Sequence, residues 1–204
     1  MTTIAIVDDH AIVRMGLKFA LTLAKDIQLV AEGECADDAV RIAKEVKPDI
    51  VLLDVRMPGE SGVDALRRII AAAPEQRVIM LTTSDTEEDV FQSVKAGAKG
   101  YVLKGTKPEI LIDDIRRVAG GGLAFPEEVR RIYEMRSEMR DLSPREKEVL
   151  EGIAKGLSNQ EIADIFGISQ NSIKMHLKHV FEKLEVADRT EAVTTAIRRG
   201  VISS

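Results

Sequence analysis

The chain has 204 residues, of which 45% are apolar and 31% charged, and its formal net charge is −5 at pH 7. This composition is typical of a globular protein with one domain or two small ones. The sequence has no apolar run of about 18 residues, no recognisable secretory leader, and one cysteine, Cys35. We therefore expect a cytoplasmic protein with no membrane partner, no intramolecular disulfide and no cysteine-based metal site.

Short apolar runs alternate with amphipathic segments over the first 118 residues. We expect strands at 4–7, 27–33, 49–54, 77–82 and 100–103, and helices at 12–24, 36–46, 62–73, 86–97 and 108–119. Strands that alternate with helices of this length form parallel sheets through right-handed crossovers. The sequence therefore predicts an α/β, flavodoxin-like (βα)5 domain over residues 1–119.

A break in the pattern follows the fifth predicted helix. Three glycines, 120–122, end that helix and Pro126 comes soon after, which is typical of a domain boundary. Residues 127–141 mix apolar and charged residues, so we expect 120–141 to form a partly helical linker. From 142 to 204 the strand pattern disappears and the apolar spacing has the period of a helix, which predicts a small all-α domain.

Helix-start and helix-stop signals divide this last region. Ser143 and Glu146 form a capping-box pattern at the start of a first helix. A second helix is expected at 159–166, a turn at Gly167, and a third helix after the cap residue Ser169. Two short helices joined by a glycine-containing turn are typical of a helix-turn-helix motif.

The third helix of this region has an apolar face and a basic face. Its apolar residues fall on one stripe, which consists of Ile173, Leu177, Val180, Phe181 and Leu184. Its outward residues are Asn171, Lys174, Met175, Lys178 and Glu182. Lysines give sequence-independent contacts to phosphates while a few other side chains read base edges, so this face suits DNA. A solvated lysine face is the alternative that the helix alone leaves open.

Acids, a hydroxyl and a lysine meet at the carboxyl edge of the predicted sheet. Asp8 and Asp9 follow the first strand, Asp54 ends the third, Thr82 ends the fourth, and Lys104 follows the fifth. Clustered carboxylates favour a cation, and hard oxygen ligands suit Mg²⁺. A hydroxyl, an ammonium and a divalent cation are what a phosphoryl group on a carboxylate requires. A turn-capping acid or an ordinary surface lysine is the alternative for each residue alone.

The segments that hold these residues are "VDDH" (7–10), "DIVLLDVRMPGESG" (49–62), "RVIMLTTS" (77–84) and "KAGAKGYVLKG" (95–105). In this order they resemble the receiver domain of two-component response regulators. The resemblance implies that Asp54 is phosphorylated, and that Asp8, Asp9, Asp54 and the backbone carbonyl of Arg56 hold Mg²⁺.

The same resemblance gives roles to three more residues. It implies that Thr82 is the switch hydroxyl and binds the phosphoryl group together with Lys104, and that Tyr101 is the switch aromatic residue. Two positions depart from the usual pattern, since Gly105 follows the lysine where proline is common, and Thr83 stands where alanine or glycine is common. We expect the larger Thr83 side chain to narrow access to the acceptor and to slow the loss of the phosphoryl group.

The segment "LSPREKEVLEGIAKGLSNQEIADIFGISQNSIKMHLKHVFEKLEVADRTEAV" resembles the LuxR-type helix-turn-helix domain. The resemblance implies that a last helix, near 189–199, mediates pairing. It also implies DNA contacts from Asn159, Ser172, Lys174, Met175, Lys178 and His179. Ser172 replaces the usual threonine, and Glu185 replaces a residue that more readily forms a left-handed cap, which leaves the base preference open.

Together the halves resemble a NarL/FixJ-type response regulator. This implies a transcription regulator that a partner histidine kinase phosphorylates, and that binds double-stranded DNA as a homodimer when phosphorylated. We expect no enzyme activity beyond accepting and slowly losing a phosphoryl group. One alternative is an aspartate-nucleophile phosphohydrolase, which would carry an acid where this chain has Arg56. The other is a constitutive DNA-binding protein whose receiver serves only for pairing.

Overall fold

The computed structural model describes residues 1–83, 86–138 and 142–202. The chain forms two compact units, one with most of residues 1–133 and one with most of residues 134–204. Within the described ranges, no helix has the length and apolar character needed to cross a membrane.

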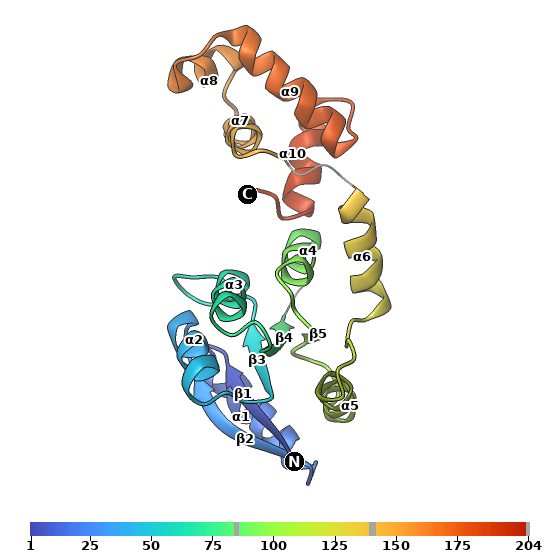
Figure 1. Cartoon of the computed structure of the whole chain (residues 1–204). Coiled ribbons are helices and arrows are strands. Elements are labelled where there is room, and N and C mark those ends of the chain that lie inside the picture. Colours follow the sequence, from blue (N-terminus) through green and yellow to red (C-terminus); the bar gives the residue numbers. More distant parts are fainter. Residues whose placement is uncertain (84–85, 139–141, 203–204) are drawn as a thin grey trace. The chain divides into compact units, whose positions relative to one another are not determined.

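The N-terminal unit is a five-stranded parallel sheet in the order β2-β1-β3-β4-β5 (Figure 1). Its strands are β1 (Thr2–Val7), β2 (Ile27–Gly33), β3 (Ile50–Asp54), β4 (Arg77–Thr82) and β5 (Gly100–Leu103). Its connecting helices are α1 (Ala11–Leu21), α2 (Ala36–Glu45), α3 (Gly62–Ala72), α4 (Glu87–Lys95) and α5 (Pro108–Ala119). The predicted α/β class and parallel sheet are confirmed.

Two hydrophobic layers enclose this sheet. One layer packs α2, α3 and α4 against one face, and the other packs α1 and α5 against the opposite face. The central strand β3 is buried along its whole length, whereas the edge strand β2 alternates between buried and more exposed residues. An unbroken apolar run is what a parallel strand covered on both faces requires.

The observed element ends differ slightly from the predicted ones. Strand β1 begins at Thr2 instead of residue 4, and α1 ends at Leu21 instead of residue 24. After Leu21 the backbone continues in tight turns, with Leu23 N donating to Ala20 O and Ala24 N to Leu21 O. Turns of this kind often follow the end of a helix, so the helical spacing of apolar residues in the sequence continues past the last residue of the helix.

The segment after α5 stays on the sheet. Ala124 forms an isolated parallel bridge with Gly100 of β5, and Val129 on α6 (Glu127–Glu138) is only 3% exposed. Residues 127–138 of the expected linker are therefore helical, and its remaining residues, 139–141, lie outside the described ranges. The domain bounds 1–119, 120–141 and 142–204 stay a prediction.

The C-terminal unit consists of α7 (Pro144–Ala154), α8 (Asn159–Phe166), α9 (Gln170–Leu184) and α10 (Arg189–Arg198). Helix α9 contributes to both of its apolar clusters, through Val180 and Leu184 in one and Ile173 and Leu177 in the other. The capping boxes of α7 and α8 are both present, and Gly167 takes the left-handed conformation with φ 64°. The expected all-α unit is confirmed.

Candidate functional site

The carboxyl edge of the sheet brings two acids together from neighbouring strands. Asp8 follows β1 and Asp54 ends β3, and these strands pair directly. The side chain of Asp8 is fully buried and that of Asp54 is 2% exposed. Carboxylates at such positions require a cation or several hydrogen bonds, because leaving water is costly for a charge.

Lys104 supplies that positive charge. Its Nζ lies 2.8 Å from Asp8 Oδ2 and 2.8 Å from Asp54 Oδ2, and its side chain is 8% exposed. The backbone fixes this position, because Lys104 N donates to Thr82 O at 2.7 Å. Three strand ends thus place one ammonium between two buried carboxylates.

The buried pair has altered acidities. Burial raises the pKa of the Asp54 carboxyl, and hydrogen bonds from Lys104 and from Arg56 N oppose that rise. Burial alone would lower the pKa of Lys104, but its hydrogen bonds to Asp54 and Asp8 outweigh burial and raise that pKa. The lysine therefore stays an ammonium throughout the physiological pH range.

The acids also form a cluster of donor atoms that fits a metal ion. Asp8, Asp9, His10 and Asp54 each offer a ligand atom, and these atoms lie within 4.8 Å of one another. Three of the four donors are carboxylates, which are the hard oxygen ligands that Mg²⁺ prefers. The site is therefore compatible with Mg²⁺. His10 lies at its rim, with Nδ1 2.8 Å from Asp9 Oδ1 and a side chain that is 59% exposed.

The other predicted residues of this unit lie on or directly after β4 and β5. Thr82 ends β4 next to β3 and is 1% exposed, and Tyr101 on β5 is also 1% exposed. Thr83 is exposed directly after Thr82. Their proposed switch and access roles stay predictions.

Two features near Asp54 were missed by the sequence reasoning. A Cβ on Gly62 would lie 1.8 Å from the backbone oxygen of Asp54, so the first residue of α3 packs against the backbone of Asp54 itself. The Arg56 guanidinium pairs with Asp89 on α4 at 3.1 Å. The sequence signal for the first was a glycine directly after a helix cap, Ser61, whereas the second had none.

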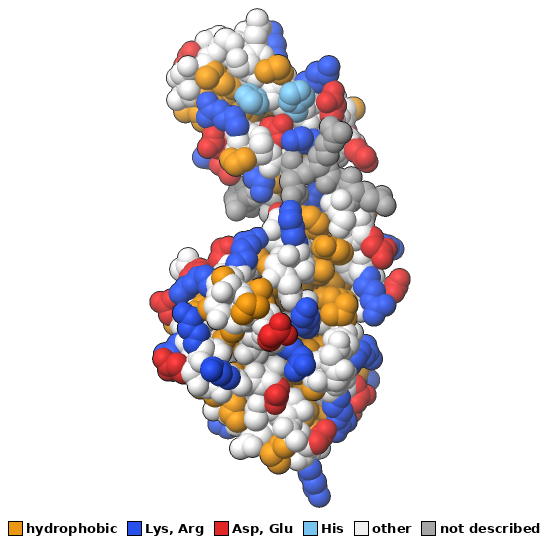
Figure 2. Space-filling model, viewed as in Figure 1, with side chains coloured by type: hydrophobic (Ala, Val, Ile, Leu, Met, Phe, Trp, Pro, Cys, Tyr) orange, Lys and Arg blue, Asp and Glu red, His pale blue; other side chains and the backbone are white. Residues whose placement is uncertain are grey.

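In the helical unit, α9 presents the predicted face to solvent. Lys174 is exposed, Met175 is 55% exposed, and the Lys178 side chain is 75% exposed and lies 3.8 Å from Glu182. Histidine side chains lie beside basic side chains on one surface of this unit (Figure 2). The structure therefore leaves these three residues accessible to a partner.

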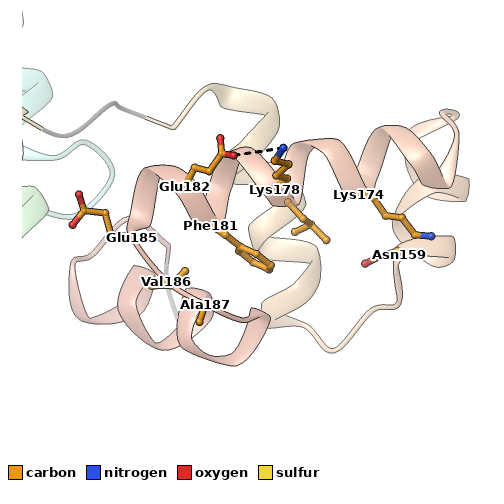
Figure 3. Close-up of a pocket in the computed structure, with 9 residues that line it drawn as sticks. Asn159, Lys174, Lys178, Phe181, Glu182, Glu185, Val186 and Ala187 are labelled. Atoms are coloured by element: carbon orange, nitrogen blue, oxygen red, sulfur yellow. Dashed lines mark ion pairs between the residues drawn. The ribbon is translucent and has the colours of Figure 1, made fainter.

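A groove of about 670 Å³ runs along α9 (Figure 3). Asn159 and Lys174 lie at one end and Glu185 at the other, and the lining consists of Asn159, Lys174, Leu177, Lys178, Phe181, Glu182, Glu185, Val186 and Ala187. Asn159 Oδ1 is buried and accepts no hydrogen bond from any described residue. The groove is thus lined both by a polar side chain of α8 and by lysines of α9.

Two more of the predicted DNA-contacting residues have contacts within the helical unit, and their role at DNA stays a prediction. The Ser172 and Ser169 hydroxyls lie 2.8 Å apart at the start of α9, and His179 Nδ1 lies 3.8 Å from Glu146 Oε1 on α7. Glu185 takes the left-handed conformation with φ 57°, so α9 ends in the usual left-handed cap despite the unfavourable residue.

Comparison with protein families gives two matches. Residues 4–116 match the model described as response regulator receiver domain, and residues 140–196 match the model described as bacterial regulatory proteins, luxR family. These ranges contain, respectively, the acid and lysine site and the α8–α9 region.

Whole-chain relatives agree with both matches. The response regulator protein VraR of Staphylococcus aureus is 37% identical over 203 residues, which cover 96% of each chain. RcsB from Salmonella enterica serovar Typhimurium, solved bound to promoter rprA with the phosphomimetic BeF3⁻, is 26% identical with a TM-score of 0.69, covering 99% of this chain and 100% of that one. A structure of two RcsB dimers bound to two parallel DNAs has a TM-score of 0.70 at 26% identity, covering 97% and 98%.

Proposed function

This chain belongs to the two-component response regulators that join a receiver domain to a LuxR-type DNA-binding domain, and we propose that phosphorylation of Asp54 by a partner histidine kinase controls its pairing and its binding to DNA. The family implies transcription regulation. The observation that carries the proposal is the pairing of Lys104 with Asp8 and Asp54 at 2.8 Å each, at the carboxyl edge of the sheet. A buried acceptor with a fixed ammonium beside it is arranged for a phosphoryl group.

The acceptor step needs an ionised Asp54. A carboxylate oxygen of Asp54 attacks the phosphorus of the donor, the new O–P bond forms as the donor's bond to phosphorus breaks, and the donor leaves with that electron pair. Asp8, Asp9, Asp54 and the Arg56 carbonyl would hold Mg²⁺, which when bound supplies charge neutralisation for the phosphoryl oxygens. Lys104 then pairs with a phosphoryl oxygen, and the Thr82 hydroxyl donates to another.

The switch follows from the change in charge and size at Asp54. Phosphorylation adds a dianionic phosphoryl group to a carboxylate oxygen of Asp54, and this group draws the Thr82 hydroxyl toward it, since phosphoryl oxygens are strong acceptors. The Tyr101 ring follows into the space that Thr82 leaves. The surface formed by α4 and β5 thereby changes, which biases the protein toward a state that pairs.

The paired state binds DNA through α9. The side chains that enter the major groove are Lys174, Met175 and Lys178. Those that lie near the sugar-phosphate backbone of the DNA are Asn159, Ser172 and His179. Support comes from the exposure of the first three residues and from RcsB, whose dimers were solved on DNA. Helix α10 mediates pairing of two helical units, and two copies double the phosphate contacts.

The test is DNA affinity at equal protein concentration, with and without a small acyl phosphate and Mg²⁺. We expect tighter binding after phosphorylation for the wild type and no change for Asp54→Asn. Equal affinity in all four samples would favour a constitutive DNA-binding protein. Arg56 occupies the place where an aspartate-nucleophile hydrolase has its acid, so we propose no enzyme activity toward other phosphoesters. Steady-state turnover of such an ester would contradict this.

A further inference from the structure

The segment that follows α5 pairs with the outer edge of β5. Tyr101 N donates to Ala124 O at 3.0 Å, and Ala124 N donates to Lys99 O at 2.9 Å. A Cβ atom placed on Gly100 would lie 3.1 Å from the Ala124 side chain, so the two segments are in close contact. An edge strand offers its free backbone groups to other strands, so this pairing closes β5 to an outside chain.

The first turns of α6 then pack on α4. The Phe91 and Tyr133 rings are stacked, with centroids 5.7 Å apart and planes at 30°, and Lys95 Nζ lies 5.1 Å from the centre of the Phe91 ring. Val129, on the same helix, is buried, and Ile132 packs against the same core. Aromatic pairs with such geometry add to the energy of burial alone.

Tyr101 belongs to this packed group. It lies in the same hydrophobic cluster as Val90 of α4 and Val129 of α6, and it is 1% exposed. Close-packed interiors do not absorb the movement of a large ring without shifts in its neighbours. Because this cluster includes residues of α4 and α6, a displacement of the Tyr101 ring can reach both helices through it.

We propose that residues 124–133 are the output partner of Tyr101, so that phosphorylation changes the packing of α6 on α4 instead of exposing a surface for a separate protein. This rests on the proposed function, because it takes phosphorylation of Asp54 as the input. Helix α6 leads directly in sequence to the DNA-binding region. The Phe91–Tyr133 stack is the contact that passes the change from the receiver to that helix.

The sequence offers a direct test, because Tyr101 and Tyr133 are its only tyrosines. The full chain is labelled with 3-fluorotyrosine, and the two ¹⁹F resonances are assigned with Tyr101→Phe and Tyr133→Phe. An acyl phosphate and Mg²⁺ are then added while intact mass reports the phosphorylated fraction. We expect both resonances to shift in proportion to that fraction, and neither to shift in Asp54→Asn.

Two further variants test the route. Phe91→Leu keeps an apolar side chain but removes the ring stack, so we expect loss of most of the Tyr133 shift while the Tyr101 shift remains. Met135→Leu, at an exposed position of α6, is the matched control and should keep both shifts.

The outcomes separate this inference from the proposed function. A full mass gain with a Tyr101 shift and an unchanged Tyr133 resonance overturns the inference alone, as does a Phe91→Leu variant with the wild-type Tyr133 shift. The absence of any mass gain overturns the proposed function, and this inference falls with it.

Discussion

The ammonium of Lys104 lies 2.8 Å from the carboxylate of Asp54, and both side chains are almost fully buried. The same ammonium is equally close to Asp8, so one positive charge serves two buried negative charges. Removing one member of a buried ionic group leaves the others uncompensated, which costs more than the group contributes as a whole.

Lys104→Met should therefore destabilise the N-terminal unit by about 3 kcal/mol in the absence of divalent cations. We expect Mg²⁺ to reduce this loss, because a bound cation would neutralise the same carboxylates. Urea unfolding with and without Mg²⁺ measures both effects, and Lys99→Met at an exposed position is the control. Equal unfolding midpoints for the two variants would contradict the account of Lys104.

Gly62→Ala should be among the most destabilising single-methyl additions in the chain. Its Cβ would lie 1.8 Å from Asp54 O, so β3 or α3 must move, and we expect a loss of at least about 3 kcal/mol. Gly16→Ala on α1 has open space around its Cβ and should be neutral or stabilising by about 0.5–1 kcal/mol. Thermal unfolding compares the two variants, and a similar effect in both would count against this packing.

Glu146 should give the helical unit a stability that depends on pH. Its side chain is buried and accepts from Lys183 Nζ at 2.6 Å and from Ser143 N at 2.7 Å. Burial favours the neutral acid, but these hydrogen bonds outweigh it and lower the pKa of Glu146 from its ordinary 4.5. A lowered carboxyl pKa stabilises the fold above the ordinary value, and the benefit is lost as pH falls through the lowered one.

We therefore expect Glu146→Gln to be less stable than the wild type by about 1–2 kcal/mol near pH 7. The difference should shrink as the pH falls below 4.5. Urea unfolding of both proteins at several pH values measures this difference. A stability difference that is constant from pH 7 to pH 3, or that grows in acid, would contradict a lowered pKa of Glu146 in the folded state.

Lys178 should contribute to DNA binding through charge. Its side chain is 75% exposed, and its contact with Glu182 at 3.8 Å is weak enough to be exchanged for a phosphate. We expect Lys178→Ala to weaken binding and to reduce the slope of log K against log salt by about 0.9 for each phosphate that Lys178 neutralises. Lys155→Ala, at an exposed position just after α7, should leave the slope unchanged. Identical slopes for both variants would show that Lys178 does not neutralise a DNA phosphate.

The strand-end positions of the acids and Lys104 could be predicted from the sequence, because parallel strands deliver their last residues to one edge. The closeness of Gly62 to Asp54 could not, since it depends on the separation of two backbones. The Phe91–Tyr133 stack was also missed, because the spacing of residues 127–141 indicated only a helical linker. Contacts between distant segments need the packed fold, whereas apolar periodicity reports only on each segment by itself.

The central claim is that Asp54 accepts a phosphoryl group, and intact mass after incubation with a small acyl phosphate and Mg²⁺ tests it most directly. Wild type and Asp54→Asn should be compared under the same conditions, with matched folding confirmed by circular dichroism. The account predicts a gain of one phosphoryl group in the wild type and none in Asp54→Asn. No gain in either protein, or an equal gain in both, would contradict it.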